Sequence, residues 1–522
     1  MRRTTPTPLL RLLLAVIVLI GPVACGSVGE SGERIAWHPC GVSDGVVGAQ
    51  VPADLAGRMA CGRVRVPIDP ADPRLGMASL VIARLAAADR HTGTVVVDPG
   101  GPGASGVGYL LGAASTLAAQ PIARTHDIVA LDRRGVGAST PSLRCRTDAE
   151  RDAERAIDFG DRTREGIARI EEYQRRLGEL CRDRVGADFL ARAGTDYAVD
   201  DLDRVRNMLG ESRIGFLGYS YGSRVGIIYA REYPGRVGAL VLDGVVDPDE
   251  DPIDASLDQV AGFGRAFDAF AADCVTRAGC PLGDRQDTAV SRYRALVGPL
   301  RARPLPVGSR VLDAGDADTG TVAGLYRQSD WPLLRGALTE LASGDGSGLL
   351  RLADTLEGRD GQGHYDGLQD AFLAISCADD TRTASRARYD LLDVGSRELA
   401  PFRDDGRGTG RGPIGVCATW PPAVGQDVAH TGTTTTTGTT TATGTATTDS
   451  ARRYPVLVIA TTGDPATPFA TAMRVARRLG AGVVTVNGYT HTASFQGDRC
   501  VDDAVNRFLA GHLTTPTHRL TC

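Results

Sequence analysis

Short apolar runs alternate with stretches of helical periodicity along much of the chain. The runs are rich in β-branched residues and predict six buried strands, at 94–98, 127–132, 214–217, 239–243, 456–460 and 483–486. Elsewhere apolar residues recur every three or four positions, which predicts amphipathic helices at 167–180, 195–209, 221–233 and 468–479. Thr195 is the expected N-cap of the second helix. Strands that alternate with helices are typical of a mostly parallel sheet, so we expect an α/β fold.

The strand pattern is interrupted between about residues 248 and 450. This stretch contains Asp- and Pro-rich turns, helical segments and four cysteines. We therefore expect a core in two parts, 35–247 and 451–522, that is split by a largely helical cap at 248–450. Within the cap, residues 431–448 consist only of Thr, Gly and Ala, and so polar and uniform a segment predicts an exposed, disordered loop.

The first 25 residues have the pattern of an export signal. Arg2 and Arg3 form a positively charged start before a nine-residue apolar segment at 12–20, which is too short to cross a bilayer as a helix. The segment ends in Val-Ala-Cys25, which resembles the lipobox of bacterial lipoproteins, although Pro22 stands where that motif usually has leucine. We expect an exported protein that is either attached to the membrane through a lipid on Cys25 or secreted after cleavage within 25–32.

The composition of the chain excludes several functions and reaction mechanisms. The 522 residues carry 58 Lys+Arg, all of them arginine, against 63 Asp+Glu, and a net charge of −5 gives no basic surface for nucleic acid. The absence of lysine excludes Schiff-base and Ser-Lys mechanisms. Neither C-x-x-C nor H-E-x-x-H occurs, so no metal site or cofactor is expected. No oligomeric state is predicted.

The cysteines predict disulfides. Eleven are present, and the ten that remain without Cys25 favour five disulfides in an exported protein. The sequence leaves several pairings open. Pairing of neighbours closes the shortest loops and is preferred: Cys40–Cys61, Cys145–Cys181, Cys274–Cys280, Cys377–Cys417 and Cys500–Cys522.

A candidate nucleophile follows the strand at 214–217. Gly218-Tyr-Ser220-Tyr-Gly222 matches G-x-S-x-G, in which a strand turns sharply into a helix and flanking side chains would clash. The predicted helix 221–233 follows directly, so the Ser220 hydroxyl is expected at the carboxyl edge of the sheet. The alternative is a Gly-Ser turn with a purely structural role.

A base and an orienting acid are available at the same edge. His491 follows the strand at 483–486, and Asp464 follows the strand at 456–460. Asp464 would hold the imidazole while His491 takes the proton of Ser220. Asp243, which ends a strand, and Asp498 are the rival acids, and His491 as an ordinary surface histidine is the alternative for the base.

An oxyanion hole needs two backbone N–H groups. Tyr221, directly after the nucleophile, offers one, and Gly101 offers the other from the glycine-rich loop after strand 94–98. A phosphate-binding loop is the alternative, but neither a Walker lysine nor G-x-G-x-x-G is present.

Three motifs together resemble the prolyl iminopeptidase and tripeptidyl aminopeptidase branch of the α/β-hydrolases, most closely the secreted, cysteine-rich tripeptidyl aminopeptidases of actinobacteria. They are Gly100-Gly-Pro-Gly103, Asp132-x-Arg134-Gly135-x-Gly137-x-Ser139 and the Ser220 motif. The chain order Ser220, Asp464, His491 is the one that α/β-hydrolases have. Pro99 replaces the histidine usual in iminopeptidases, and the Thr-rich segment is an insertion.

The resemblance implies an exported serine exopeptidase acting on peptides with a free N-terminus. Such an enzyme needs an anion for the substrate's ammonium group, and Asp379 in the cap is the candidate, with a solvated acidic turn as the alternative. An esterase or lipase could use the same three side chains. A third possibility is a non-catalytic lipoprotein that uses the fold for binding at the cell surface.

Overall fold

A computed structural model describes residues 34–41, 44–45, 51–380, 385–420, 454–511 and 520–522. The predicted signal peptide with Cys25 and the Thr-rich segment 431–448 lie outside the described residues. Contacts divide the chain into two units, Met1–Arg34 and Ile35–Cys522, and the fold is that of the second unit.

The predicted strands form the centre of a nine-stranded sheet with the order β1-β2-β4-β3-β5-β6-β9-β10-β11. Strand β2 is antiparallel to both of its neighbours, and every other pair in the sheet is parallel. The α/β fold class is therefore confirmed. The strands are β1 (Met59–Pro67), β2 (Met77–Leu85), β3 (Gly93–Asp98), β4 (His126–Leu131), β5 (Ile214–Tyr219), β6 (Val237–Asp243), β9 (Val456–Thr461), β10 (Gly482–Val486) and β11 (Leu520–Thr521).

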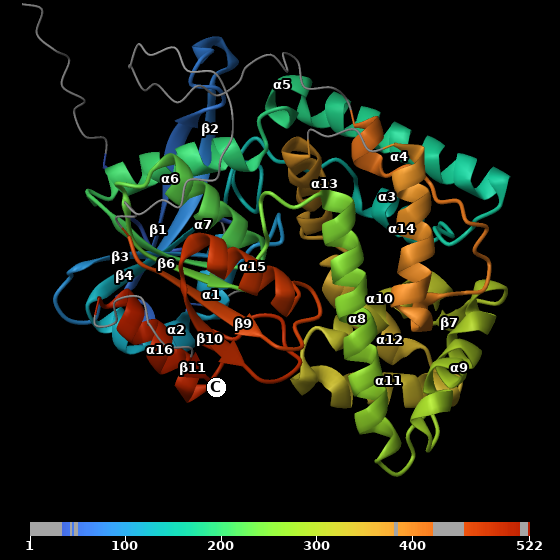
Figure 1. The fold of residues 1–522 in the computed structure, drawn as a ribbon. Coiled ribbons are helices and arrows are strands. Elements are labelled where there is room, and N and C mark those ends of the chain that lie inside the picture. The colour runs from blue at the N-terminus through green and yellow to red at the C-terminus, as the bar shows by residue number, and fades with distance from the viewer. Residues whose placement is uncertain (1–33, 42–43, 46–50, 381–384, 421–453, 512–519) are drawn as a thin grey trace, which may run out of the picture. The chain divides into compact units, whose positions relative to one another are not determined.

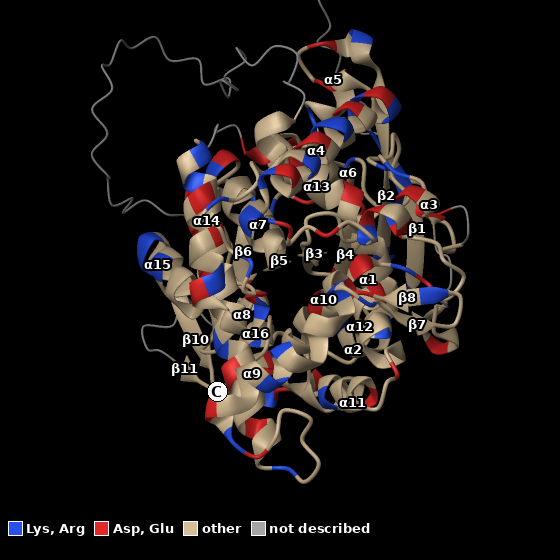
Figure 2. Cartoon of the chain, turned by 90° about the vertical axis from the view of Figure 1, so that its right-hand side faces the viewer, with Lys and Arg blue, Asp and Glu red and all other residues tan. Residues whose placement is uncertain are grey.

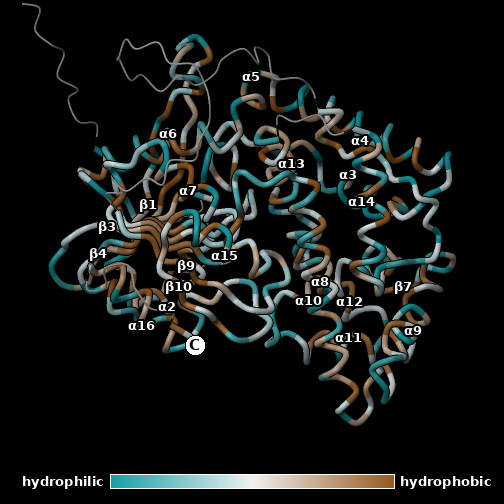
Figure 3. The backbone as a smooth tube through the Cα atoms, viewed as in Figure 1, coloured by the Kyte–Doolittle hydropathy of each residue, from teal (hydrophilic) through white to brown (hydrophobic). Residues whose placement is uncertain are grey.

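Helices cover both faces of the sheet, and the strands between them are its most hydrophobic part (Figures 1 and 3). One face packs against α1 (Gly106–Gly112), α2 (Ala114–Ala118) and α16 (Arg499–Leu509), and the other against α6 (Thr195–Met208), α7 (Tyr221–Glu232) and α15 (Phe469–Leu479). The predicted N-cap of α6 is wrong by one residue. Gly194 is the cap, and the hydroxyl of Thr195 is used in a contact described below.

Two insertions into the sheet form the rest of the unit. The first, between β4 and β5, contains α3 (Asp148–Arg155), α4 (Arg164–Val185) and α5 (Ala187–Leu190). The second, between β6 and β9, has its own aromatic core in which Phe267 stacks on Phe402. Its elements are α8 (Pro252–Val275), α9 (Gln286–Val297), β7 (Leu305–Val307), β8 (Arg310–Leu312), α10 (Ala314–Leu325), α11 (Trp331–Ala342), α12 (Ser347–Glu357), α13 (Leu368–Asp379) and α14 (Arg386–Leu399).

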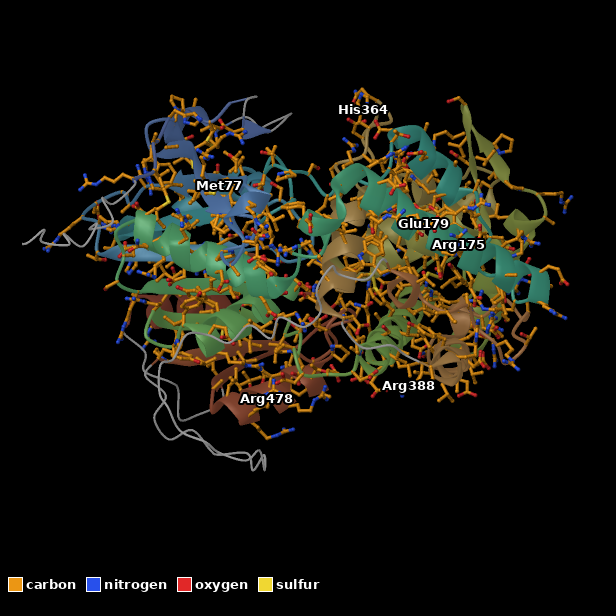
Figure 4. The ribbon with its side chains drawn as sticks, turned by 90° about the horizontal axis from the view of Figure 1, so that it is seen from above. Met77, Arg175, Glu179, His364, Arg388 and Arg478 are labelled. Carbon is orange, nitrogen blue, oxygen red and sulfur yellow. A yellow bond between two sulfur atoms is a disulfide. The ribbon has the colours of Figure 1, made fainter. Side chains whose placement is uncertain are left out.

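Ion pairs connect the first insertion to the second. Basic and acidic residues are interspersed on α14 and around α3 and α4 (Figure 2). The imidazole of His364, labelled in Figure 4, contacts the Asp148 carboxylate at 3.0 Å. Further pairs across the two insertions are Arg155–Asp316, Arg359–Asp152, Arg386–Glu171 and Arg407–Asp158. Thus α3 and α4, which fall within the predicted core part 35–247, form a second wall of the cap.

All five preferred disulfides are present, so the pairing of neighbouring cysteines is confirmed. The Cys377–Cys417 bond ties the end of α13 to a short turn at 416–419. In the part of the chain that the structure describes, no helix combines the length and hydropathy required to span a bilayer.

Candidate active site

Ser220 stands on a strained turn between β5 and α7. Its φ of 52° lies in the left-handed region, which is unfavourable for a residue with a side chain. A Cβ added at Gly218 would lie 2.3 Å from the carbonyl oxygen of Gly222, and one added at Gly222 would lie 2.4 Å from that of Asp98. Both glycines are therefore required for the turn. The N–H of Ser220 donates to the carbonyl of Asp243 at 2.8 Å, which attaches the turn to β6.

The glycine-rich loop after β3 presses against this turn. A Cβ at Gly100 would lie 2.5 Å from the carbonyl oxygen of Tyr219. Arg133 fixes the loop by donating to the carbonyl of Gly100 at 2.9 Å, and its guanidinium lies 5.1 Å from the centre of the Tyr221 ring. Within the described residues, the N–H groups of Gly101 and Tyr221 have no hydrogen-bond acceptor. Two unused donors thus flank the Ser220 turn, as an oxyanion hole requires.

Asp464 and His491 meet at the carboxyl edge of the sheet. The Nδ1 of His491 lies 3.0 Å from Oδ1 of Asp464 and 3.1 Å from Oδ2. The Asp464 side chain is buried and accepts hydrogen bonds from the N–H groups of Ala466 and Thr467 and from the Thr467 hydroxyl, each at 2.9 Å. These bonds fix the carboxylate on the Nδ1 side of the ring and leave Nε2 as the nitrogen for proton transfer.

The charge of Asp464 favours His491 as a base. Burial alone would lower the pKa of His491, but the charge and the hydrogen bond of Asp464 outweigh it and raise that pKa above 6.5. The second insertion also holds the histidine, because the His491 N–H donates to the carbonyl of Tyr326 at 2.8 Å and the two rings meet edge to face. The imidazole is thus oriented by the core on one side and by the cap on the other.

The two rival acids have other partners. Asp498 caps α16 by accepting from the N–H groups of Cys500 and Val501. Asp243 is fully buried at the end of β6, and its Oδ2 accepts from the N–H groups of Ala493 and Ser494 at 2.9 and 2.7 Å. Asp243 therefore holds the loop that follows His491, and burial raises the pKa of its carboxyl group.

Asp379 contacts the nucleophile helix instead of facing an open site. Its carboxylate accepts from the N–H and hydroxyl of Thr195 at 2.7 Å each, from the Tyr221 hydroxyl, and from Nε of Arg224 at 3.1 Å. The side chain is only 10% exposed. It is neither the solvated acidic turn nor an open anion site, and these contacts favour a role in fixing α13 against Tyr221.

A cavity of about 1060 Å³ lies between the two insertions. Its walls come from α3, α4, α8, α9, α13 and α14 and from the start of α10, and they combine apolar side chains with many arginines and carboxylates. Two wall residues also contact the catalytic loops. Gln259 donates to the carbonyl of Ala466, and the backbone of Phe372 lies where a side chain at Gly103 would be. The cavity is therefore separated from these loops by single helices.

Several residues of this site carry no sequence signal. Thr467 and Gly244 belong to no motif, and Arg133 occupies an unspecified position of one. Arg133 and Gly244 contact residues distant in sequence, whereas Thr467 bonds Asp464, three residues before it. A Cβ at Gly244 would lie 3.0 Å from Cε1 of His491, so this glycine makes room for the imidazole. Only the strand-end position of Gly244, directly after Asp243, could have indicated it.

Comparison with known proteins agrees with this fold. The model of the family described as alpha/beta hydrolase fold matches residues 93–498, a range that contains Ser220, Asp464 and His491. Serine protease Hip1 of Mycobacterium tuberculosis is 38% identical over 514 residues, covering 97% of this chain and 94% of that protein. Carboxylesterase B of the same species is 41% identical over 465 residues, covering 88% and 86%. Tripeptidyl aminopeptidase of Streptomyces coelicolor is 27% identical over 465 residues, covering 86% and 80%.

Proposed function

The chain belongs to the α/β-hydrolase fold family, and from this premise we propose that it is a serine peptidase that works through an acyl-enzyme on Ser220. It is a serine hydrolase. The observation that carries the assignment of residues is the strained Ser220 between two unused N–H donors, with a buried carboxylate paired to His491 at the same sheet edge.

In the proposed reaction, Oγ of Ser220 attacks the scissile carbonyl carbon while Nε2 of His491 takes its proton. The oxyanion accepts hydrogen bonds from the N–H groups of Gly101 and Tyr221. When the intermediate collapses, the C–N bond breaks and His491 gives its proton to the leaving amine. Water then attacks the ester with His491 as base, which releases the acid and restores Ser220.

The peptidase assignment is supported by the relatives named as a serine protease and a tripeptidyl aminopeptidase. The relative named as a carboxylesterase makes ester hydrolysis the second candidate. We further propose an exopeptidase that releases short peptides or single residues from a free N-terminus, which the relative named as a tripeptidyl aminopeptidase supports.

Covalent labelling tests the nucleophile. A fluorophosphonate probe should label the protein, and Ser220→Ala should abolish both labelling and turnover. Ser115→Ala, at an exposed position on α2, is the matched control and should label normally. Labelling that persists in Ser220→Ala would place the reactive nucleophile on another residue. Absence of labelling in the unaltered protein would leave the non-catalytic binding lipoprotein as the better description.

Chromogenic substrates then separate the two activities. We expect higher kcat/KM for aminoacyl and tripeptidyl amides with a free N-terminus than for the same peptides with an acetylated N-terminus. Faster turnover of simple acyl esters than of any peptide would favour the esterase.

We also propose that the protein is exported and attached to the membrane by a lipid on Cys25. Five disulfides in the described residues support an oxidising compartment. Radiolabelled palmitate should enter the protein, and Cys25→Ala should lose the label and move from the membrane fraction to the medium. If the unaltered gene instead gives protein that carries no label and is found in the medium, this would support secretion without a lipid.

A further inference from the structure

Asp243, the last residue of β6, binds both the nucleophile turn and the loop of the catalytic histidine. Its backbone carbonyl accepts from the N–H of Ser220 at 2.8 Å. The residue is only 1% exposed, and its Oδ2 accepts from the N–H groups of Ala493 and Ser494 at 2.9 and 2.7 Å. Asp243 therefore connects the position of Ser220 to that of His491, which precedes Ala493 by two residues.

The loop that follows the catalytic histidine is strained and needs such an anchor. Thr492 and Phe495 have φ values of 65° and 59°, in the left-handed region that residues with a side chain rarely adopt. The two N–H groups between them converge on one oxygen of Asp243, as successive backbone N–H groups do in anion-binding concavities. The hydroxyl of Tyr219, directly before the nucleophile, donates to the carbonyl of Ser494 at 3.1 Å. The carboxylate of Asp243 therefore holds a backbone conformation that would otherwise relax and displace the imidazole.

The charge of Asp243 also acts on the imidazole of His491. Burial lowers the pKa of His491, whereas the charge and the hydrogen bond of Asp464 raise it. The charge of Asp243 raises this pKa further, and that of Arg327 lowers it. Arg327 directly follows the C-cap of α10, and its backbone pairs with that of Thr490. Two carboxylates therefore act on the imidazole against one guanidinium ion, so a proton on His491 balances the charge of this group.

The carboxylate of Asp243 is kept in this position at a cost. Burial raises the pKa of its carboxyl group, the bonds from residues 493–494 lower it, and the like charge of Asp464 raises it. Tyr109 on α1 and Tyr219 on β5 are also near, and burial and the charge of Asp243 raise the pKa of both hydroxyls. Within the described residues, Oδ1 of Asp243 is buried without a hydrogen bond of acceptable geometry. A neutral amide would hold the two N–H groups at a lower desolvation cost, so a carboxylate at this position indicates that its charge is used.

We propose that Asp243 is a positioning residue for the reaction of Ser220 and acts through His491. Its hydrogen bonds fix the imidazole beside the nucleophile, and its charge stabilises the imidazolium ion that forms when Oγ of Ser220 loses its proton. Asp464 remains the acid that orients the ring, because it lies 3.0 Å from Nδ1. The proton passes from Ser220 to Nε2 of His491 and later to the leaving group, and neither carboxylate takes it. This inference rests on the proposed roles of Ser220 and His491 and adds a second carboxylate to them.

The decisive variant is Asp243→Asn. The carbonyl oxygen of asparagine accepts the N–H groups of Ala493 and Ser494, so the variant keeps the anchor and loses the charge. The readouts are the rate at which a fluorophosphonate labels Ser220 and kcat/KM for a small acyl ester, each measured between about pH 5 and pH 9. Without the charge the pKa of His491 falls, so the acidic limb of both profiles should move to lower pH by about 0.5–1 pH unit. The rates on the plateau should fall about three- to tenfold, because one pKa unit corresponds to a tenfold change in the stability of the imidazolium ion.

Asp243→Ala tests the position of the imidazole. This variant removes the acceptor of both N–H groups together with the charge, so the loop at 491–495 relaxes and the base is displaced. The plateau value of kcat for the ester should fall about a hundredfold with KM nearly unchanged, because the substrate still binds while the base is out of place. Thermal unfolding shows whether each variant is folded, and Asp243→Asn carries the test alone if Asp243→Ala is not.

Asp127→Asn is the matched control. Asp127 is a buried carboxylate near the start of β4, at the opposite edge of the sheet from Ser220, where it accepts from the N–H of Ala87 at 2.9 Å. This variant should lose stability and keep both pH profiles. An acidic limb that does not move in Asp243→Asn, or plateau rates equal to those of the unaltered enzyme, would overturn the inference, because a purely structural carboxylate changes stability without moving the limb. Failure of the fluorophosphonate to label Ser220 in the unaltered protein would instead be a failure of the proposed function.

Discussion

Gly244 shows how closely the site is packed at the level of single residues. Its φ is +67°, and an added Cβ would lie 3.0 Å from atoms of His491, Thr467 and Thr492. We expect Gly244→Ala to displace the imidazole and lower kcat at least tenfold, with a loss of stability of about 1 kcal/mol from the backbone. Steady-state kinetics and thermal unfolding measure the two effects.

Gly480→Ala is the matched control for this change. Gly480 has a φ of +53° at the end of α15, but nothing lies within 4 Å of its added Cβ. It should lose a similar amount of stability and keep its kcat. Equal kcat values for the two variants would show that the contact with His491 has no catalytic consequence.

The pH profile depends on the His491–Asp464 pair. The imidazole must be neutral to accept a proton, so kcat/KM should fall as pH falls through the pKa of His491. Because Asp464 raises this pKa above 6.5, the acidic limb should lie above pH 6.5. Asp464→Asn removes the charge that raises the pKa and leaves burial, so its residual activity should have the limb at lower pH. An unmoved limb would indicate that another group titrates.

The sequence was sufficient for residues that directly follow a strand or belong to a motif. Ser220, Asp464 and His491 were located because three predicted strands end just before them, and the structure places Asp464 and His491 in contact. Asp379 was correctly expected on a segment tethered by a cysteine. Its partners, Thr195 and Tyr221, are more than 150 residues away, and no local pattern indicates them.

At the level of elements, α13 connects the cap to the nucleophile helix. Asp379 at its end binds Thr195, Tyr221 and Arg224. Asp379→Asn loses the ion pair with Arg224, and its amide NH2 group is a donor where a carboxylate oxygen was an acceptor. We therefore expect the free energy of unfolding to fall by about 2–3 kcal/mol. Chemical denaturation measures this loss.

The same variant tests whether Asp379 binds the substrate's amine. Because the carboxylate of Asp379 is already engaged in hydrogen bonds within the protein, Asp379→Asn should lower kcat/KM equally for peptides with a free and with an acetylated N-terminus. A loss of kcat/KM confined to free-amine peptides would assign the amine-binding role to Asp379.

Among the elements that the sequence analysis does not predict are β1 and β2 at one edge of the sheet. In β1 the buried Val64 and Val66 alternate with the exposed Arg63 and Arg65, a period of two that indicates a strand with one covered face. The uniformly apolar runs of the central strands predict strands directly, whereas β1 has only this alternation. The helix at 167–180 was predicted and is α4, but its attachment to the cap depends on long-range arginine pairs.

For the whole molecule, the ion pairs across the cap predict its response to acid. The pKa values of Asp152, Asp354 and Asp405 are lowered because their arginine partners outweigh burial. A carboxylate with a lowered pKa in the folded protein contributes stability above its unfolded pKa of about 4, and this is lost as pH falls through the folded value. We therefore expect the cap to loosen below about pH 4 before the sheet does.

Pepsin digestion between pH 4 and pH 2 can check this order, because pepsin is active there. The first cleavage sites, mapped by mass spectrometry, should fall in α3, α4 and α10–α14. First cleavage within β3–β6 would contradict the expectation.

The cap's division into two stretches of chain has a consequence for protein engineering. Its walls are encoded on either side of β5, α7 and β6, so no single contiguous gene segment carries the whole lid. Transplanting only the longer stretch from a relative would leave Arg155, Arg151 and Glu171 facing foreign partners, and a buried charge without its counterion is strongly destabilising. Chimeras that exchange specificity within this family should therefore need both segments to be exchanged together, with two crossovers for each segment and the nucleophile strand kept between them.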